Sequence, residues 1–131
     1  ELKNEPRLEW IEQPLPAKDI EGLFALANQL PIALDESLVE FPYLGEIWKS
    51  WKIRRPLLDG DPRLLLNEIE KGVSQTVIST AFETGIGIRW INLLAAKQRE
   101  GKNPCAPGLA PGWRPKGRLF DSDPKIVWDA A

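Results

Sequence analysis

The chain has 131 residues, enough for one domain of ordinary size with a real hydrophobic core. Its composition, 43% hydrophobic and 27% charged, is typical of a folded globular protein and excludes a disordered or fibrous one. Lys and Arg number 17 against 19 Asp and Glu, so the charge offers no attraction toward nucleic acid or an anionic membrane.

The residue types that are scarce limit the chemistry further. Histidine is absent, which removes the usual general base and the commonest transition-metal ligand. The single cysteine, Cys105, excludes an internal disulfide and a multi-cysteine zinc site. No apolar run reaches the roughly 20 residues that cross a bilayer, and no signal peptide is visible, so we expect a cytoplasmic location. Because methionine is also absent, we expect the chain to be an excerpt of a longer polypeptide.

Strand-like and helix-like segments alternate along the first half of the chain. The predicted strands here are 8–13, 32–36 and 51–56. The predicted helices are 18–30 and, with a weaker pattern, 40–50. Asp19 is the expected N-cap of the first helix, whereas Pro42 and Gly45 interrupt the second.

The second half continues the alternation. Its predicted elements are a helix at 62–71, a strand at 74–80 and a helix at 86–99. The first of these helices has Pro62 after Asp61 at its start and Gly72 after its end, which are the usual start and stop signals.

The last part of the chain is a loop-rich tail, 103–131. Residues 103–124 are rich in Pro and Gly, with a possible fifth strand in the stretch CAPGLA, 105–110. The short apolar piece KIVW, 125–128, is interpreted as an edge strand or a packing tail.

Strands that alternate with helices at this spacing indicate right-handed βαβ units and a parallel sheet, an α/β fold. Two architectures are compatible with the pattern. One is a doubly wound sheet of four or five strands, and the other is part of a (β/α)₈ barrel, which needs about 250 residues.

Two predicted strands end in a carboxylate. Glu12 closes the first apolar run and Asp35 closes the second. Ligands bind at the carboxyl ends of parallel strands in either architecture, so the two acids predict a site for a divalent metal with oxygen ligands, such as Mg²⁺. The alternative is that each acid caps the following helix or pairs with a nearby Arg.

Other polar residues follow the next two strands. Arg55 would bring a cation to the same rim, or would lie on a solvated basic edge strand. Ser79 and Thr80 place two hydroxyls after the fourth strand. Glu83 is interpreted either as a site residue or as a cap of the helix that follows.

The succession IEQPLP, ALDES, RRPLLDG, VISTAFETGIG and PGLA resembles the C-terminal half of the enolase-superfamily barrel, over about residues 8 to 112. The resemblance is to the muconate-cycloisomerase-like subgroup, and within it to the o-succinylbenzoate synthase family. It implies that residues 1–131 form the C-terminal part of a (β/α) barrel domain, without the N-terminal capping domain and the first strands.

The resemblance also implies roles for individual residues. Glu12 matches the second of three Mg²⁺ ligands of the family, and Asp35 matches the third. The family removes a proton next to a carboxylate and stabilises the enediolate on the metal. In the synthase, water is then lost on the path to menaquinone or phylloquinone. Ser79, Thr80 and Gly108 match positions that line the pocket for this small carboxylate substrate.

One position departs from the family pattern. Arg55 stands where the family usually has Lys, and an Arg stays protonated and cannot serve as a base, although it can hold positive charge against an anionic intermediate. That change would disable a two-base racemase. A syn elimination, which runs with one Lys on the opposite face, would tolerate it.

The Lys-x-Lys pair and the first Asp ligand of the family belong to earlier strands and have no counterpart in these 131 residues. We therefore expect this chain alone to be an inactive fragment that needs the N-terminal part of the enzyme. Its unpaired strand edges would also allow association into a homo-oligomer.

Two alternatives remain at this point. One keeps the superfamily but makes the chain part of an N-acylamino acid racemase, a dipeptide epimerase or a muconate cycloisomerase. The other is a non-catalytic α/β module, in which Glu12, Asp35 and Arg55 form structural ion pairs.

Overall fold

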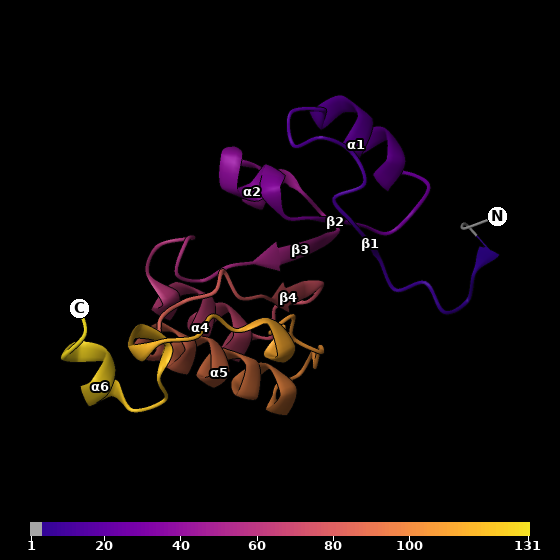
Figure 1. Cartoon of the computed structure of the whole chain (residues 1–131). Helices are drawn as coiled ribbons and strands as arrows, with labels where there is room; N and C mark the ends of the chain where they lie inside the picture. The colour runs from indigo at the N-terminus through magenta and orange to yellow at the C-terminus, as the bar shows by residue number, and fades with distance from the viewer. Residues whose placement is uncertain (1–3) are drawn as a thin grey trace. The chain divides into compact units, whose positions relative to one another are not determined.

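The computed structural model describes residues 4–131, in which helices and strands alternate (Figure 1). The chain divides into two compact units, Glu1–Ile53 and Arg54–Ala131. No helix within residues 4–131 has the length and apolar character needed to cross a membrane.

The first unit carries the beginning of a parallel sheet. Its strands are β1 (Ile11–Glu12), β2 (Ile32–Leu34) and β3 (Trp51–Arg54), the last of which ends just past the unit boundary. Its helices are α1 (Ile20–Ala27), α2 (Glu36–Glu40) and α3 (Leu44–Ile47). β2 pairs in parallel with both neighbours, through Ile11 with Ile32 and Ala33 with Trp51. Parallel pairing brings the carboxyl ends of β1 and β2 to the same edge.

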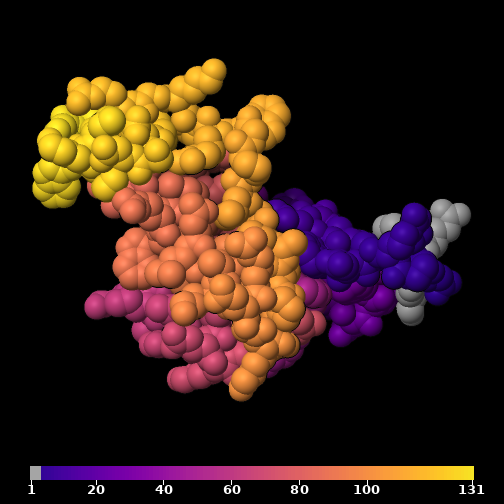
Figure 2. All heavy atoms as spheres, turned by 90° about the horizontal axis from the view of Figure 1, so that it is seen from below, coloured from indigo at the N-terminus to yellow at the C-terminus, as the bar shows by residue number. Residues whose placement is uncertain are grey.

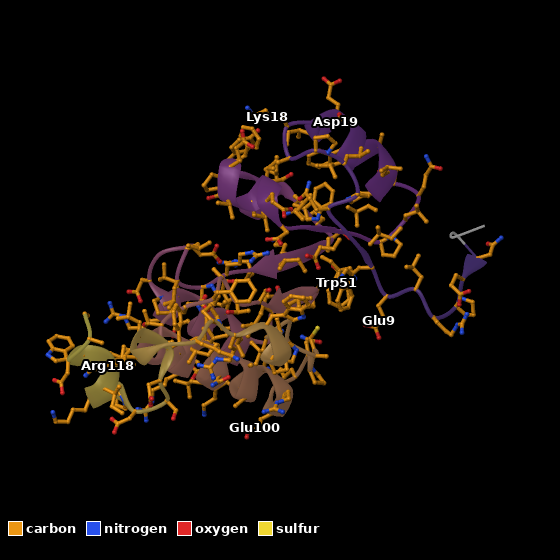
Figure 3. All side chains as sticks on the ribbon, in the orientation of Figure 1. Glu9, Lys18, Asp19, Trp51, Glu100 and Arg118 are labelled. Carbon is orange, nitrogen blue, oxygen red and sulfur yellow. The ribbon has the colours of Figure 1, made fainter. Side chains whose placement is uncertain are left out.

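Local signals explain the helices of this unit. Asp19, labelled in Figure 3, precedes α1, and its carboxylate accepts a hydrogen bond from the Gly22 N–H at 3.0 Å, which confirms the predicted cap. The weak helical stretch at 40–50 is divided at Pro42 between α2 and α3, because proline lacks an amide proton. The helices cover a core that includes β2, made by Leu23, Ile32, Leu34, Leu44 and Trp48.

The second unit has one strand between two longer helices. These elements are α4 (Pro62–Lys71), β4 (Thr76–Ile78) and α5 (Gly85–Glu100). Both helix predictions are confirmed: Asp61 caps α4, and Gly72 ends it in the left-handed conformation at φ 88°. The strand and both helices share a core formed by Leu65, Ile69, Ile78, Ile88, Ile91 and Leu94.

The tail differs from its prediction at its end. It contains the short 3₁₀ helices η2 (Pro111–Trp113) and η3 (Arg118–Phe120), and then the α-helix α6 (Pro124–Trp128). The edge strand proposed for 125–128 is therefore wrong. Asp123 accepts a hydrogen bond from the Lys125 N–H and Pro124 occupies the first turn, a combination that starts a helix. Val127 of α6 is buried, and Figure 2 shows these last residues, in yellow, lying against the rest of the second unit.

The strand predictions are confirmed in place but are too long. Each run extends beyond its hydrogen-bonded part, and the expected fifth strand is reduced to one parallel bridge between Ser79 and Gly108. The strand order is β1-β2-β3-β4. A doubly wound sheet reverses its strand order at a switch point, so that alternative is wrong, and the sequential order is that of a barrel.

Candidate active site

The two predicted metal ligands stand at the carboxyl ends of adjacent strands in the first unit. Glu12 is the last residue of β1, and Asp35 directly follows β2. Their surroundings differ. Glu12 is exposed, whereas Asp35 is only 1% exposed. A carboxylate buried to this extent requires hydrogen bonds or a cation to offset its lost hydration.

Neither acid caps a helix. The helix that follows Glu12 is α1, and its capping side chain is that of Asp19. Asp35 occupies the N-cap position of α2, but its side chain makes no capping hydrogen bond. The helix-cap alternative is therefore wrong for both residues. It follows that the position of the two carboxylates needs another explanation, either as metal ligands or as members of ion pairs.

Gln13, which follows Glu12, connects the ends of β1 and β2. Its side-chain oxygen accepts hydrogen bonds from the Asp35 N–H at 3.0 Å and from the Ser37 N–H at 3.3 Å. Its side-chain nitrogen donates to the Ser37 hydroxyl at 2.9 Å and to the Leu15 carbonyl at 3.0 Å. Neither Gln13 nor Ser37 is among the site residues predicted from the sequence, although each lies within two residues of a predicted ligand.

The second unit brings together the other predicted site residues. Ser79 and Gly108 form the parallel bridge, and the Ser79 hydroxyl donates to the Gly108 carbonyl at 3.2 Å. The Thr80 N–H bonds to the same carbonyl at 3.2 Å. Arg55 Nη1 donates to the Thr80 carbonyl at 2.9 Å. These contacts place all four residues at the carboxyl end of β4.

The side chains of the neighbouring Arg54 and Arg55 bind different partners. Arg54 makes ion pairs with Asp59 at 2.7 Å and with Glu68 of α4 at 3.2 Å. Arg55 instead donates to Thr80, beyond the end of β4. Consecutive side chains at the end of β3 therefore have different partners.

Glu83 holds the turn after β4. One carboxylate oxygen accepts from the Thr80 hydroxyl at 2.6 Å, and the other accepts from the Ala81 N–H at 2.9 Å. The Thr80 hydroxyl also accepts from the Phe82 N–H at 2.9 Å, so it is engaged within the turn. The cap of α5 is Thr84, which accepts from the Gly87 N–H at 3.3 Å, so the reading of Glu83 as a helix cap is wrong.

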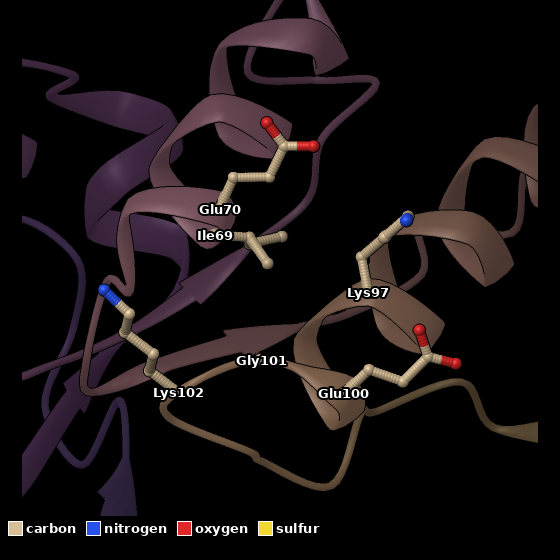
Figure 4. A pocket seen from close by; sticks show the side chains of 6 residues that line it. All are labelled: Ile69, Glu70, Lys97, Glu100, Gly101 and Lys102. Atoms are coloured by element: carbon tan, nitrogen blue, oxygen red, sulfur yellow. The ribbon is translucent and has the colours of Figure 1, made fainter.

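A groove of the second unit lies away from these residues. It is lined by Ile69, Glu70, Lys97, Glu100, Gly101 and Lys102 (Figure 4). These residues lie in the last turns of α4 and α5 or directly after α5, and α4 is the helix that precedes β4. Since the helices run opposite to the strands, the groove is at the amino end of β4, whereas barrel active sites form at the carboxyl end.

The two carboxylates are suitable ligands for a hard cation but are too few to form a complete site. Oxygen ligands are those that Mg²⁺ prefers, and Glu12 and Asp35 offer two carboxylates that are not used as caps. Within residues 4–131 no group of three or more Asp, Glu, His or Cys side chains is arranged to hold a metal ion. These two acids would therefore supply part of a coordination shell.

The sequential parallel strands and the polar residues at their carboxyl ends define the class of fold, a C-terminal portion of an enolase-superfamily (β/α) barrel. The solved structure that carries this assignment is o-succinylbenzoate synthase from Thermosynechococcus elongatus BP-1, complexed with Mg in its active site. The two chains are 28% identical and superpose with a TM-score of 0.72 over 99% of this chain and 43% of the synthase chain. This chain thus spans less than half the length of that relative. No protein-family model matches the sequence, and a search of curated proteins gave no match.

Proposed function

We propose that the chain is the C-terminal part of an Mg²⁺-dependent dehydratase that makes o-succinylbenzoate from 2-succinyl-6-hydroxy-2,4-cyclohexadiene-1-carboxylate, in the biosynthesis of menaquinone or phylloquinone. The observation that carries the proposal is the likeness of 99% of the chain to an o-succinylbenzoate synthase with Mg in its active site. The carboxylates at the ends of β1 and β2, which do not cap helices, support it.

In this proposal Glu12 and Asp35 hold the metal. Magnesium, when bound, supplies Lewis-acid stabilisation of the negative charge that develops on the substrate carboxylate. The 1% exposure of Asp35 keeps water away from its carboxylate, which strengthens any electrostatic interaction that it makes. The exposed Glu12 carries little desolvation cost.

Arg55 acts as a fixed cation in the proposed reaction. Its guanidinium stays protonated at any working pH, so it stabilises negative charge and takes no proton. The hydrogen bond from Nη1 to the Thr80 carbonyl restricts its position. Ser79 and Gly108, which form the bridge next to it, line the substrate pocket together with Thr80. The proton itself is moved by a base supplied from outside these 131 residues, as the resemblance to the family implies.

The test uses the full polypeptide as encoded, which contains these residues. With Mg²⁺ and the cyclohexadiene substrate we expect formation of o-succinylbenzoate, and we expect no racemisation of N-acylamino acids faster than this dehydration. Racemisation without dehydration would overturn the proposal in favour of the racemase alternative. If Glu12→Gln and Asp35→Asn both keep the activity of the parent, these acids have a role in structural ion pairs and not in metal binding.

A further inference from the structure

Gln13 has a backbone conformation that its residue type rarely adopts. Its φ is 37°, in the left-handed region that favours glycine, and it directly follows the last residue of β1. Its N–H still donates to the Ala33 carbonyl of β2 at 2.8 Å. A glycine would fit this backbone more easily, so the presence of glutamine points to a requirement for its side chain.

The side chain uses its full hydrogen-bonding capacity. A primary amide has two donor hydrogens and two acceptor lone pairs. The oxygen of Gln13 accepts from the N–H groups of Asp35 and Ser37, and the nitrogen donates to Leu15 and to the Ser37 hydroxyl. The Ser37 hydroxyl in turn donates to the Ala17 carbonyl at 3.0 Å. One amide therefore joins the loop after β1 to the start of α2.

One of these bonds replaces a helix cap. An N-cap side chain ordinarily accepts a hydrogen bond from the second or third N–H of its own helix. In α2 the N-cap is Asp35 and the second helical residue is Ser37, whose N–H bonds to Gln13 instead. The amide of Gln13 thus satisfies a donor that the Asp35 carboxylate would otherwise satisfy.

We infer that Gln13 is a positioning residue for Asp35: it caps α2 in place of Asp35 and fixes the backbone of Asp35 at the end of β2, so that the carboxylate is directed to metal binding and away from capping. The inference rests on the proposed function for the metal. In this role the amide of Gln13 orients a metal ligand through hydrogen bonds and does not touch the ion.

The decisive variant is Gln13→Gly, because glycine accepts the positive φ and removes the amide. Gln75→Gly is its matched control. Gln75 also has a positive φ, 52°, and its side chain is exposed and makes no hydrogen bond within residues 4–131. Both substitutions change the same residue type in the same backbone region, so a difference between them reports the side-chain contacts.

The experiment titrates the full encoded polypeptide with Mn²⁺ as the probe ion and follows free Mn²⁺ by electron paramagnetic resonance, with thermal unfolding measured in parallel. We expect Gln13→Gly to weaken Mn²⁺ binding by about 10- to 100-fold, the usual cost of losing a residue that orients a metal ligand, and we expect Gln75→Gly to bind Mn²⁺ as the parent does. Ser37→Ala, which keeps both bonds to the Gln13 oxygen, should weaken binding less. Equal affinity in Gln13→Gly and the parent would overturn the inference while leaving the proposed function intact.

A second readout separates the two claims. If the parent binds no Mn²⁺, the proposed metal site is wrong, and so is the claim that Gln13 positions the Asp35 carboxylate for metal binding. Amide hydrogen exchange of Ser37 then still decides the capping role. Faster exchange of the Ser37 N–H in Gln13→Gly than in Gln75→Gly supports capping by Gln13, and equal exchange rates overturn it.

Discussion

Arg55 Nη1 donates a hydrogen bond to the carbonyl oxygen of Thr80 at 2.9 Å. This hydrogen bond holds the Arg55 guanidinium next to the turn after β4, which contains the hydroxyls of Ser79 and Thr80. It also gives Arg55 a structural task that a shorter, titratable lysine would perform less well, because the ammonium lacks the planar array of donors.

The first prediction concerns the charge of Arg55. In the full encoded polypeptide, Arg55→Met should lower kcat for dehydration by roughly 10²- to 10³-fold, the typical cost of removing one group that stabilises transition-state charge. Arg55→Lys should lose less, because its charge remains. Arg54→Met is the matched control: Arg54 pairs with Asp59 and Glu68, so removal of its charge should leave kcat unchanged. Equal kcat in Arg55→Met and the parent would contradict the assigned role.

The second prediction concerns the turn held by Glu83. Glu83→Ala removes the acceptor of two hydrogen bonds, from the Thr80 hydroxyl and the Ala81 N–H. We expect the free energy of unfolding in urea to fall by about 1.5–3 kcal/mol, the range for hydrogen bonds to a charged group. Glu83→Gln keeps an acceptor oxygen and should lose less. A Glu83→Ala variant as stable as Glu83→Gln would show that these bonds are not needed.

The third prediction concerns the packing of the tail on α5. A Cβ atom on Gly85 would overlap the carbonyl oxygen of Asp121 and would approach Val127 Cγ2 at 3.0 Å. Gly85→Ala should therefore lower the free energy of unfolding by about 1–3 kcal/mol, as overpacking usually does. Gly45→Ala is the control, because a Cβ there meets nothing within 4 Å and helix α3 should gain stability. A Gly85→Ala variant of unchanged stability would contradict the close packing of the tail.

The fourth prediction concerns acid. The Arg63 guanidinium, hydrogen-bonded to the Asp61 carboxylate, lowers the pKa of Asp61 from 3.8 to about 2. Because the folded-state pKa is depressed, the stability that this group contributes is fully present above pH 3.8 and is lost as the pH falls toward about 2. Carbon-detected NMR titration of the Asp61 carboxyl measures the shift directly.

The control for this prediction is Asp61→Asn, which still caps α4 but carries no charge to titrate. Its stability should depend less on pH in the same window than that of the parent. An Asp61 pKa at its ordinary value would contradict the prediction.

Helices whose boundaries carry strong local signals could be predicted from the sequence. Asp61, Pro62 and Gly72 mark α4 by their residue types alone, and the structure uses all three as expected. The same Asp-Pro signal stands at Asp123 and Pro124. The apolar run that follows it also fits a short strand, which is why a strand is one of the two predictions for 125–128. The predicted strands are longer than the observed ones, because apolar character does not show which residues form hydrogen bonds with a neighbouring strand.

The acids of the candidate site were found because each follows an apolar run, a signal visible in the sequence. The contacts of Gln13 were not found, because its partners Asp35 and Ser37 are more than 20 residues away and only the pairing of β1 with β2 brings them close. The polar residues beside both acids, Gln13 and Ser37, were the available hint. Their spacing alone does not indicate which atoms meet.

The position of a bound ion tests the proposed metal site most directly. Mn²⁺ shares the preference of Mg²⁺ for oxygen ligands and scatters anomalously, so crystals of the full encoded polypeptide soaked in Mn²⁺ would locate the site. We predict one anomalous peak within coordination distance, roughly 2.1 Å, of carboxylate oxygens from both Glu12 and Asp35. A peak elsewhere, or no peak with both carboxylates held in ion pairs, would contradict it.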